Sequence, residues 1–82
     1  MFKDARTRLI EFLKNLGTEQ GETKGNTIEI NHLLTQKDIA DLIGISRPTL
    51  NSLLNELKSE GMVDFQRKVI KLYTNKLQLL AS

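Results

Sequence analysis

Cysteine is absent from this sequence, and proline, aromatic residues and long apolar runs are scarce. Without cysteine the chain can form neither a disulfide framework nor a thiolate metal site. Its apolar runs fall far short of the ~20 residues that a membrane-spanning helix needs. The amino terminus also lacks the hydrophobic region of a secretory signal. These absences exclude a disulfide scaffold, predict no membrane span and are compatible with the cytoplasmic location that we expect.

Catalytic motifs are missing as well. The chain has neither a phosphate-binding loop nor a G-x-S-x-G nucleophile motif, and His32 is its only histidine. A lone histidine between a strand and a helix is typical of a surface or capping residue, and no second ligand stands at metal-binding spacing. A chain of 82 residues buries only about 60–65% of its unfolded surface, which leaves little room for an enclosed active site. We therefore predict that the chain is not an enzyme and holds no metal or cofactor.

The net charge is only +2, so its distribution along the chain matters more than its sum. Residues 1–35 carry five basic and five acidic side chains, whereas residues 61–82 carry four basic and one acidic. The basic residues of this last part are Arg67, Lys68, Lys71 and Lys76. Such a surplus serves either solubility or contact with an anionic partner.

The middle of the chain predicts two short helices separated by a sharp turn. Thr35 can cap the first helix, and Asp38 can complete a capping box. Gly44 ends this helix, because a left-handed backbone is cheap only without a side chain. Ser46 is a second cap, and Pro48 falls in the first turn of the next helix, where its missing N–H costs nothing.

The second predicted helix, about residues 46–60, has one apolar and one polar face. Its apolar face follows the i, i+3, i+4, i+7 rule and consists of Leu50, Leu53, Leu54 and Leu57. The opposite face consists of Pro48, Ser52, Asn55 and Ser59, with Thr49 and Asn51 on its flanks. Gly61 then stands where a left-handed residue ends a helix, with Met62 placed to pack back on Leu57.

The spacing within this pair of helices is typical of a helix-turn-helix. A small residue, Ala40, stands where the helices cross, and Gly44 stands at the turn. The interlocking positions are all apolar: Ile39, Ile43, Ile45, Leu50 and Leu53. A plain helical hairpin in a core is the alternative, but it does not require the small residue, the glycine and the nearby cap together.

The flanking segments predict further elements. Residues 4–16 show a helical apolar stripe that ends at Gly17, and residues 18–26 contain no apolar side chain and predict a loop. Residues 27–30 alternate as a short strand does. We expect residues 75–82 to form a short amphipathic helix or a tail.

A β-hairpin is predicted after the second helix. Residues 62–65 and 69–73 are short and rich in β-branched and aromatic side chains. The tip between them carries Arg67 and Lys68. A hairpin in this place, with 27–30 available as a third strand, is the layout of a winged helix, in which the tip cations would lie beside a bound duplex.

The segment T-Q-x-x-I-A-x-x-x-G-x-S-R-x-T, residues 35–49, resembles the DNA-binding domain of Crp/Fnr-type bacterial transcription regulators. The resemblance extends from the first helix to Tyr73. It implies an α+β, mostly helical fold, a winged helix-turn-helix with a three-helix core and a small antiparallel sheet, in which residues 1–82 form a single domain. It also implies sequence-specific binding of double-stranded DNA in transcription regulation, with helix 46–60 in the major groove and the wing, 62–73, on the backbone.

The resemblance further implies roles for individual residues. Arg47 would read a guanine through a bidentate pair to O6 and N7. Thr49, and with it the Ser46 hydroxyl, would contact phosphate, and the amino end of the preceding helix would rest on the DNA backbone. The wing would add a basic contact, for which Lys68 is the matching residue. The candidate DNA-binding residues are Thr35, Gln36, Lys37, Ser46, Arg47, Pro48, Thr49, Asn51, Ser52, Asn55, Arg67 and Lys68.

Two departures from the family affect specificity. Many members carry a glutamate where Pro48 stands and an arginine where Ser52 stands, and those two side chains help to read bases. We therefore expect a DNA site unlike the better-known ones. Asn51, Ser52 and Asn55 can contribute adenine or backbone contacts.

Regulators of this kind normally carry an amino-terminal β-barrel that senses an effector, followed by a long helix that makes the dimer. We expect this chain to be the excised carboxyl-terminal domain of such a regulator rather than a natural stand-alone module. An effector would then bind the missing domain, no cofactor would bind this chain, and the whole protein would be a homodimer that also meets RNA polymerase. The alternative function is a winged-helix module for protein–protein interaction, since the outer face of helix 46–60 has no basic residue beyond Arg47.

Overall fold

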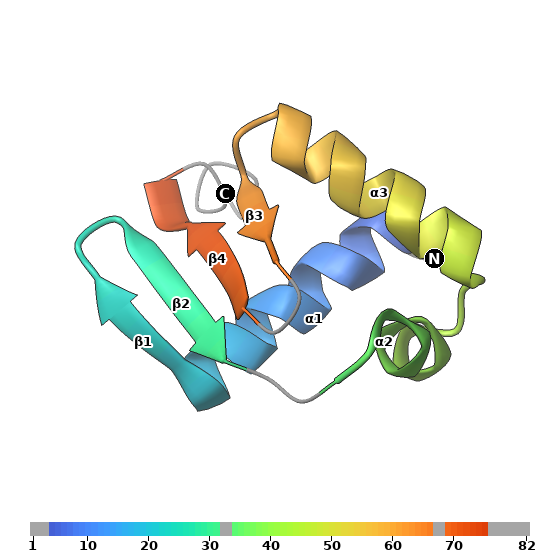
Figure 1. Ribbon diagram of the computed structural model, residues 1–82, viewed down its shortest axis with the longest axis horizontal. Helices are drawn as coiled ribbons and strands as arrows, with labels where there is room; N and C mark the ends of the chain where they lie inside the picture. Colours follow the sequence, from blue (N-terminus) through green and yellow to red (C-terminus); the bar gives the residue numbers. More distant parts are fainter. Residues whose placement is uncertain (1–3, 32–33, 67–68, 76–82) are drawn as a thin grey trace.

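Three helices and a four-stranded antiparallel sheet make up the part of the chain that the computed structural model describes, residues 4–31, 34–66 and 69–75 (Figure 1). The helices are α1 (Ala5–Gln20), α2 (Gln36–Ile43) and α3 (Arg47–Ser59). The strands are β1 (Gly21–Lys24), β2 (Thr27–Asn31), β3 (Val63–Phe65) and β4 (Val69–Tyr73). The predicted three-helix core with a small antiparallel sheet is confirmed. His32, Arg67, Lys68 and the predicted tail from residue 76 onward lie outside the described residues.

The sheet has the strand order β1-β2-β4-β3, and all its neighbouring strands are antiparallel. Strand β4 is one of the two inner strands, with Ile70 opposite Ile30 of β2 and Leu72 opposite Val63 of β3. These four side chains are buried, because alternate residues of a strand point to the same face. The predicted hairpin after the second helix and its third strand are therefore confirmed.

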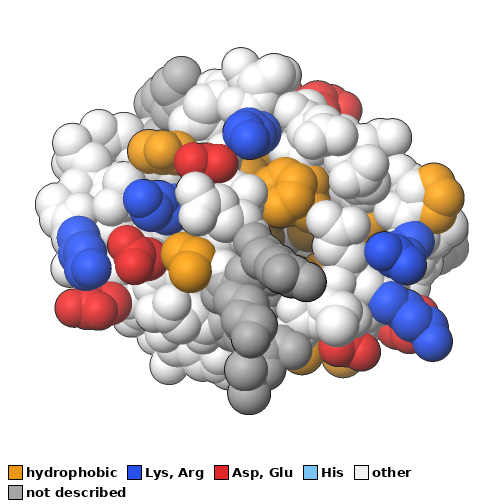
Figure 2. Space-filling view, in the orientation of Figure 1, with side chains coloured by type: hydrophobic (Ala, Val, Ile, Leu, Met, Phe, Trp, Pro, Cys, Tyr) orange, Lys and Arg blue, Asp and Glu red, His pale blue; other side chains and the backbone are white. Residues whose placement is uncertain are grey.

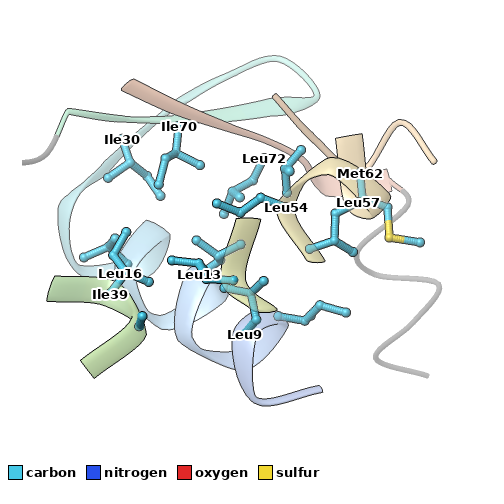
Figure 3. Packing of buried hydrophobic residues seen from close by; sticks show 14 residues of the cluster. Leu9, Leu13, Leu16, Ile30, Ile39, Leu54, Leu57, Met62, Ile70 and Leu72 are labelled. Atoms are coloured by element: carbon cyan, nitrogen blue, oxygen red, sulfur yellow. The ribbon is translucent and has the colours of Figure 1, made fainter. Parts of the chain in front are cut away.

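The hydrophobic core lies between this face of the sheet and the three helices (Figure 3). Helix α1 crosses behind the sheet, and α2 and α3 pack against each other beside it (Figure 1). The largest fully buried side chains are Leu9, Leu13, Ile30, Leu50, Leu57, Val63 and Leu72. The three helices and strands β2, β3 and β4 all contribute apolar side chains to one common core, so the position of α3 depends on the packing of these elements.

The prediction that the first helix stops at Gly17 is wrong. Helix α1 begins after Asp4, whose carboxylate accepts a hydrogen bond from the Thr7 N–H at 2.7 Å, and it continues to Gln20. A Cβ atom at Gly17 would lie 3.0 Å from Leu72 Cδ1. Gly17 therefore lets the helix approach the sheet closely and does not end it.

The prediction that residues 18–26 form a loop is also wrong. Residues 18–20 continue α1, and Gly21–Lys24 form β1, which pairs with β2 across a two-residue turn of Gly25 and Asn26. Gly25 has a positive φ of 61°. The side chains of β1 are almost all exposed, so the strand is held by backbone pairing and leaves no apolar alternation in the sequence.

The carboxyl end of α3 is confirmed as predicted. Gly61 has a φ of 74°. Its N–H donates to the Lys58 carbonyl, and the Met62 N–H donates to the Leu57 carbonyl, both at 3.0 Å. This pair of hydrogen bonds is the Schellman motif, and buried Met62 supplies its apolar contact. The motif turns the chain directly from α3 into β3.

Candidate nucleic-acid interface

The amino end of α2 is held by a complete capping box. The Thr35 hydroxyl accepts from the Asp38 N–H at 3.1 Å, and the Asp38 carboxylate accepts from the Thr35 N–H at 3.0 Å. This hydrogen bond from the Thr35 backbone lowers the pKa of Asp38. Thr35 and Lys37 are exposed, and Gln36 is half-buried. The first turn of α2 therefore presents backbone N–H groups, the Lys37 cation and the Asp38 carboxylate to the outside. The N–H groups and the lysine are the groups there that suit phosphate.

The turn between α2 and α3 is fixed by backbone hydrogen bonds. Gly44 is left-handed, with φ 84° and ψ 37°. The N–H groups of Gly44 and Ile45 both donate to the Ala40 carbonyl, at 2.8 and 3.0 Å. The Arg8 guanidinium of α1 donates to the neighbouring Ile43 carbonyl at 3.1 Å. These hydrogen bonds fix the backbone conformation of the turn, and this conformation sets the direction in which α3 starts.

The amino end of α3 has its own cap. The Ser46 hydroxyl oxygen accepts from the Thr49 N–H at 3.2 Å and donates to the Thr49 hydroxyl at 2.8 Å. Because Ser46 uses its proton in this contact, the proton of the Thr49 hydroxyl stays available for a partner. Pro48 lies in the first turn, where its lack of an N–H leaves no intrahelical bond unmade.

The two faces of α3 differ sharply in exposure. Leu50 and Leu57 are 0% exposed and Leu54 is 3% exposed. Every residue predicted for the outer face or its flanks is exposed: Pro48, Thr49, Asn51, Ser52, Asn55 and Ser59. Arg47, at the leading end of the helix, is exposed as well. Arg47 is the only charged side chain in this part of the helix. The outer face therefore offers amide and hydroxyl groups with one cation at the leading end, which are the groups that contact base edges.

An open hollow joins the start of α2, the start of α3 and the end of β3. It is lined by Thr35, Gln36 and Arg47 from the predicted set, and by Phe65 and Gln66 beside the wing. Its remaining lining residues are apolar: Leu34, Ile39, Leu54 and Ile70. Figure 2 shows apolar side chains at the centre of this face, where the surface is hollowed. The structure thus brings residues from both helices of the pair to one side of the molecule.

The wing reaches the same side of the molecule. The Gln66 N–H donates to the Val69 carbonyl at 2.8 Å, which closes the hairpin just before its tip. Arg67 and Lys68 occupy that tip in the sequence and lie outside the described residues. Their predicted role in DNA binding therefore stays a prediction.

Two arginines of α1 that were not identified from the sequence contact the helix pair that carries this surface. Arg8 contacts the turn, as described above, and Arg6 binds Glu60 at the far end of α3. The hydrogen bonds to Glu60 raise the pKa of Arg6. No local sequence signal could have revealed either contact, since each joins residues 35 or more positions apart.

The described residues offer no other site of obvious chemistry. Among them no group of three or more histidine, cysteine, aspartate or glutamate side chains could hold a metal ion. None of the helices described is long and apolar enough to cross a membrane.

Comparison with known protein families gives a match over most of the chain. Residues 7–80 match the family of Crp-like helix-turn-helix domains. A CRP-like cAMP-activated global transcriptional regulator of Mycobacterium tuberculosis is 31% identical over 70 residues, which cover 85% of this chain and 31% of that protein. The HTH-type transcriptional regulator ArcR of Staphylococcus epidermidis is 36% identical over 61 residues, covering 74% of this chain and 27% of that protein.

Solved structures show the same fold. The chain superimposes on a variant of CooA from Carboxydothermus hydrogenoformans with a TM-score of 0.88 and 32% identity, covering 100% of this chain and 38% of that one. Oxidized CprK in complex with o-chlorophenolacetic acid gives a TM-score of 0.84 and 29% identity, covering 96% of this chain and 34% of that one. The chain spans about a third of the length of the relatives that it matches.

Proposed function

This chain belongs to the family of Crp-like helix-turn-helix domains, and from this premise we propose that it binds double-stranded DNA sequence-specifically in the regulation of transcription. Helix α3 enters the major groove and the β3–β4 wing lies on the backbone. One observation carries the proposal: the outer face of α3 is exposed from its first turn onward and polar, while its leucines are buried. The relatives named above are transcription regulators, and no enzymatic activity is proposed.

Phosphate contacts come from the two helix starts. Thr35, Gln36 and Lys37 rest on the DNA backbone through the free N–H groups of α2 and the lysine charge. Thr49 donates its hydroxyl proton to a phosphate, since its oxygen already accepts from Ser46 at 2.8 Å. These contacts fix the register of the domain on the duplex and carry no sequence information.

Base contacts come from the outer face of α3. Arg47, at its leading end, pairs with O6 and N7 of a guanine. Asn51, Ser52 and Asn55 follow along the exposed face and contribute adenine or backbone contacts. Pro48 and Ser52 replace residues that read bases in many members of the family, so the preferred site differs from the better-known ones.

The longer regulator is also a proposal. The CRP-like relative is described as cAMP-activated, and CooA as a CO-dependent transcription factor. We propose that this chain likewise works beside an effector-binding amino-terminal domain in a cytoplasmic homodimer that also meets RNA polymerase. In such a dimer the two α3 helices would engage half-sites about one helical turn apart.

The proposal is tested by selecting duplexes from a random pool at low salt and then measuring affinity for the selected site against salt concentration. If the domain contacts phosphates, the logarithm of its association constant should fall linearly with the logarithm of the salt concentration. The slope should be roughly −0.9 for each phosphate neutralised. We expect a defined consensus, a negative slope and weak binding by the single domain. A pool without consensus, or an affinity that does not change with salt, would favour the protein-interaction module instead.

A further inference from the structure

Arg6, in the first turn of α1, binds the carboxyl end of α3. Its two terminal nitrogens donate to the two carboxylate oxygens of Glu60 at 2.7 and 2.8 Å, and one of them also contacts Glu56. The Arg6 side chain is 26% exposed, so the guanidinium is partly withdrawn from water. A planar guanidinium that binds one carboxylate with two parallel hydrogen bonds fixes direction as well as distance.

The two glutamates need such a partner. Glu56 and Glu60 stand four positions apart on a helix, so their like charges face each other, and they lie at the end of α3 that carries the negative partial charge. The one basic residue in the last turn of α3, Lys58, lies 3.7 Å from Asp64 and over the Phe65 ring. Lys58 therefore binds the wing side, whereas Arg6 contacts both members of the glutamate pair.

Arg8 performs a similar task at the other end of α3. Its guanidinium donates to the Ile43 carbonyl at 3.1 Å, in the last turn of α2. That turn contains no basic residue of its own, so a cation from α1 supplies the favourable charge at the end of α2. Together, the two arginines connect α1 to the turn that precedes α3 and to the carboxyl end of α3.

We propose that Arg6 and Arg8 are positioning residues that set the angle at which α3 meets DNA. This inference rests on the proposed function. The leucine contacts of α3 are apolar and have no preferred direction, whereas the arginine contacts do. The two ion pairs of Arg6 remain partly exposed, and such pairs contribute little to stability, so we assign their main effect to orientation. Specific binding requires α3 to be held within a narrow range of positions and angles on the duplex. Binding to random duplex tolerates small rotations of the helix.

The test compares Arg6→Gln with Lys14→Gln. Both variants lower the net charge from +2 to +1, and Lys14 lies elsewhere on α1, beside Glu11 and Asn15. We expect Arg6→Gln to reduce the affinity ratio between selected and random duplexes about fivefold or more, and Lys14→Gln to leave that ratio unchanged. Affinity for random duplex should fall equally in both, because both lose one positive charge.

A charge exchange separates positioning from simple loss of stability. In the double variant Arg6→Glu/Glu60→Arg the net charge stays at +2 and an ion pair can form again in reverse, so most of the lost ratio should return. Arg8→Gln should also lower the ratio, and Arg6→Lys should lower it partly, because lysine lacks the planar fork. All variants are first checked for folding by far-UV circular dichroism.

The outcomes separate the two proposals. A wild-type chain that does not distinguish the selected from the random duplex would overturn the proposed function. If the wild-type chain distinguishes them, an Arg6→Gln ratio equal to wild type would overturn the positioning role alone, and so would a lowered ratio that does not recover in the exchanged variant.

Discussion

The two faces of α3 carry different kinds of residue and have different roles. The leucine face is closed against the core, with Leu50 and Leu57 0% exposed. The outer face, which includes Asn51 and Asn55, is open to solvent. The fold depends on the first face, and we propose that DNA recognition depends on the second. Changes on one face should therefore leave the property of the other largely intact.

If the proposed function holds, this division allows the same fold to be combined with different DNA sites. The helix is placed by its leucines, by the caps at Thr35 and Ser46 and by the Schellman motif at Gly61. None of these depends on which polar side chain stands at position 52 or 55. Departures from the family at Pro48 and Ser52 can therefore change the preferred bases without changing the fold.

The largest effect is expected from the leucine face. Leu57→Ala removes a fully buried side chain and should lower the free energy of unfolding by about 2–5 kcal/mol. The matched change on the outer face, Asn55→Ala, should alter it by less than about 0.5 kcal/mol. Urea denaturation followed by circular dichroism measures both values. Equal losses would show that α3 is not packed through its leucines.

The next effect is expected from the outer face. Arg47→Ala should cost about 1–3 kcal/mol on the selected site and relax the preference at one base pair. The free energy of unfolding should stay almost constant, because Arg47 is exposed. Titration of the selected and a random duplex under the same salt conditions measures the difference. A loss of the same size on both duplexes would contradict base reading by Arg47.

The cap of α3 belongs to neither face and should give a smaller effect. Ser46→Ala removes the acceptor for the Thr49 N–H and should lower the free energy of unfolding by about 1 kcal/mol. Ser46→Gly should lower the free energy of unfolding by only a few tenths of a kcal/mol, because glycine is tolerated at this position. If both variants unfold at the same urea concentration as wild type, the cap contributes nothing to stability.

The smallest effect lies outside α3, in the capping box of α2. The Asp38 carboxylate is held by the Thr35 N–H, which lowers its pKa in the folded state from 3.8. Its contribution to stability is therefore fully present above pH 3.8 and is lost as the pH falls through the lowered value. With Asp38→Asn the free energy of unfolding should fall less on acidification than it does in the wild type. With Asp38→Glu the fall on acidification should remain. Unfolding free energies across this pH range check the sign.

The helix-turn-helix could be predicted from the sequence because its signals are local. Thr35 and Asp38 form their capping box over three residues, and Gly44, Ser46 and Gly61 act where they stand. The leucine stripe of α3 repeats within a single helix. Each of these features depends only on residues that are close together in the sequence, so the sequence was enough to predict them.

The features that were missed depend on distant partners. Strand β1 pairs through its backbone with β2, and a strand with exposed side chains leaves no hydrophobic pattern. Gly17 matters because Leu72 lies against it, and Arg6 matters because it reaches Glu60. In the candidate site, exposure of the outer face followed from the helical period, whereas support from α1 required the tertiary structure.

Amide chemical shifts show whether the leading end of α3 contacts DNA. A selected duplex is added at low ionic strength to the isotope-labelled chain, and shift changes are mapped onto the structure. We expect the largest changes in residues 46–55 and in the first turn of α2. Unchanged shifts in both segments, with changes centred on another surface such as β1, would contradict this expectation.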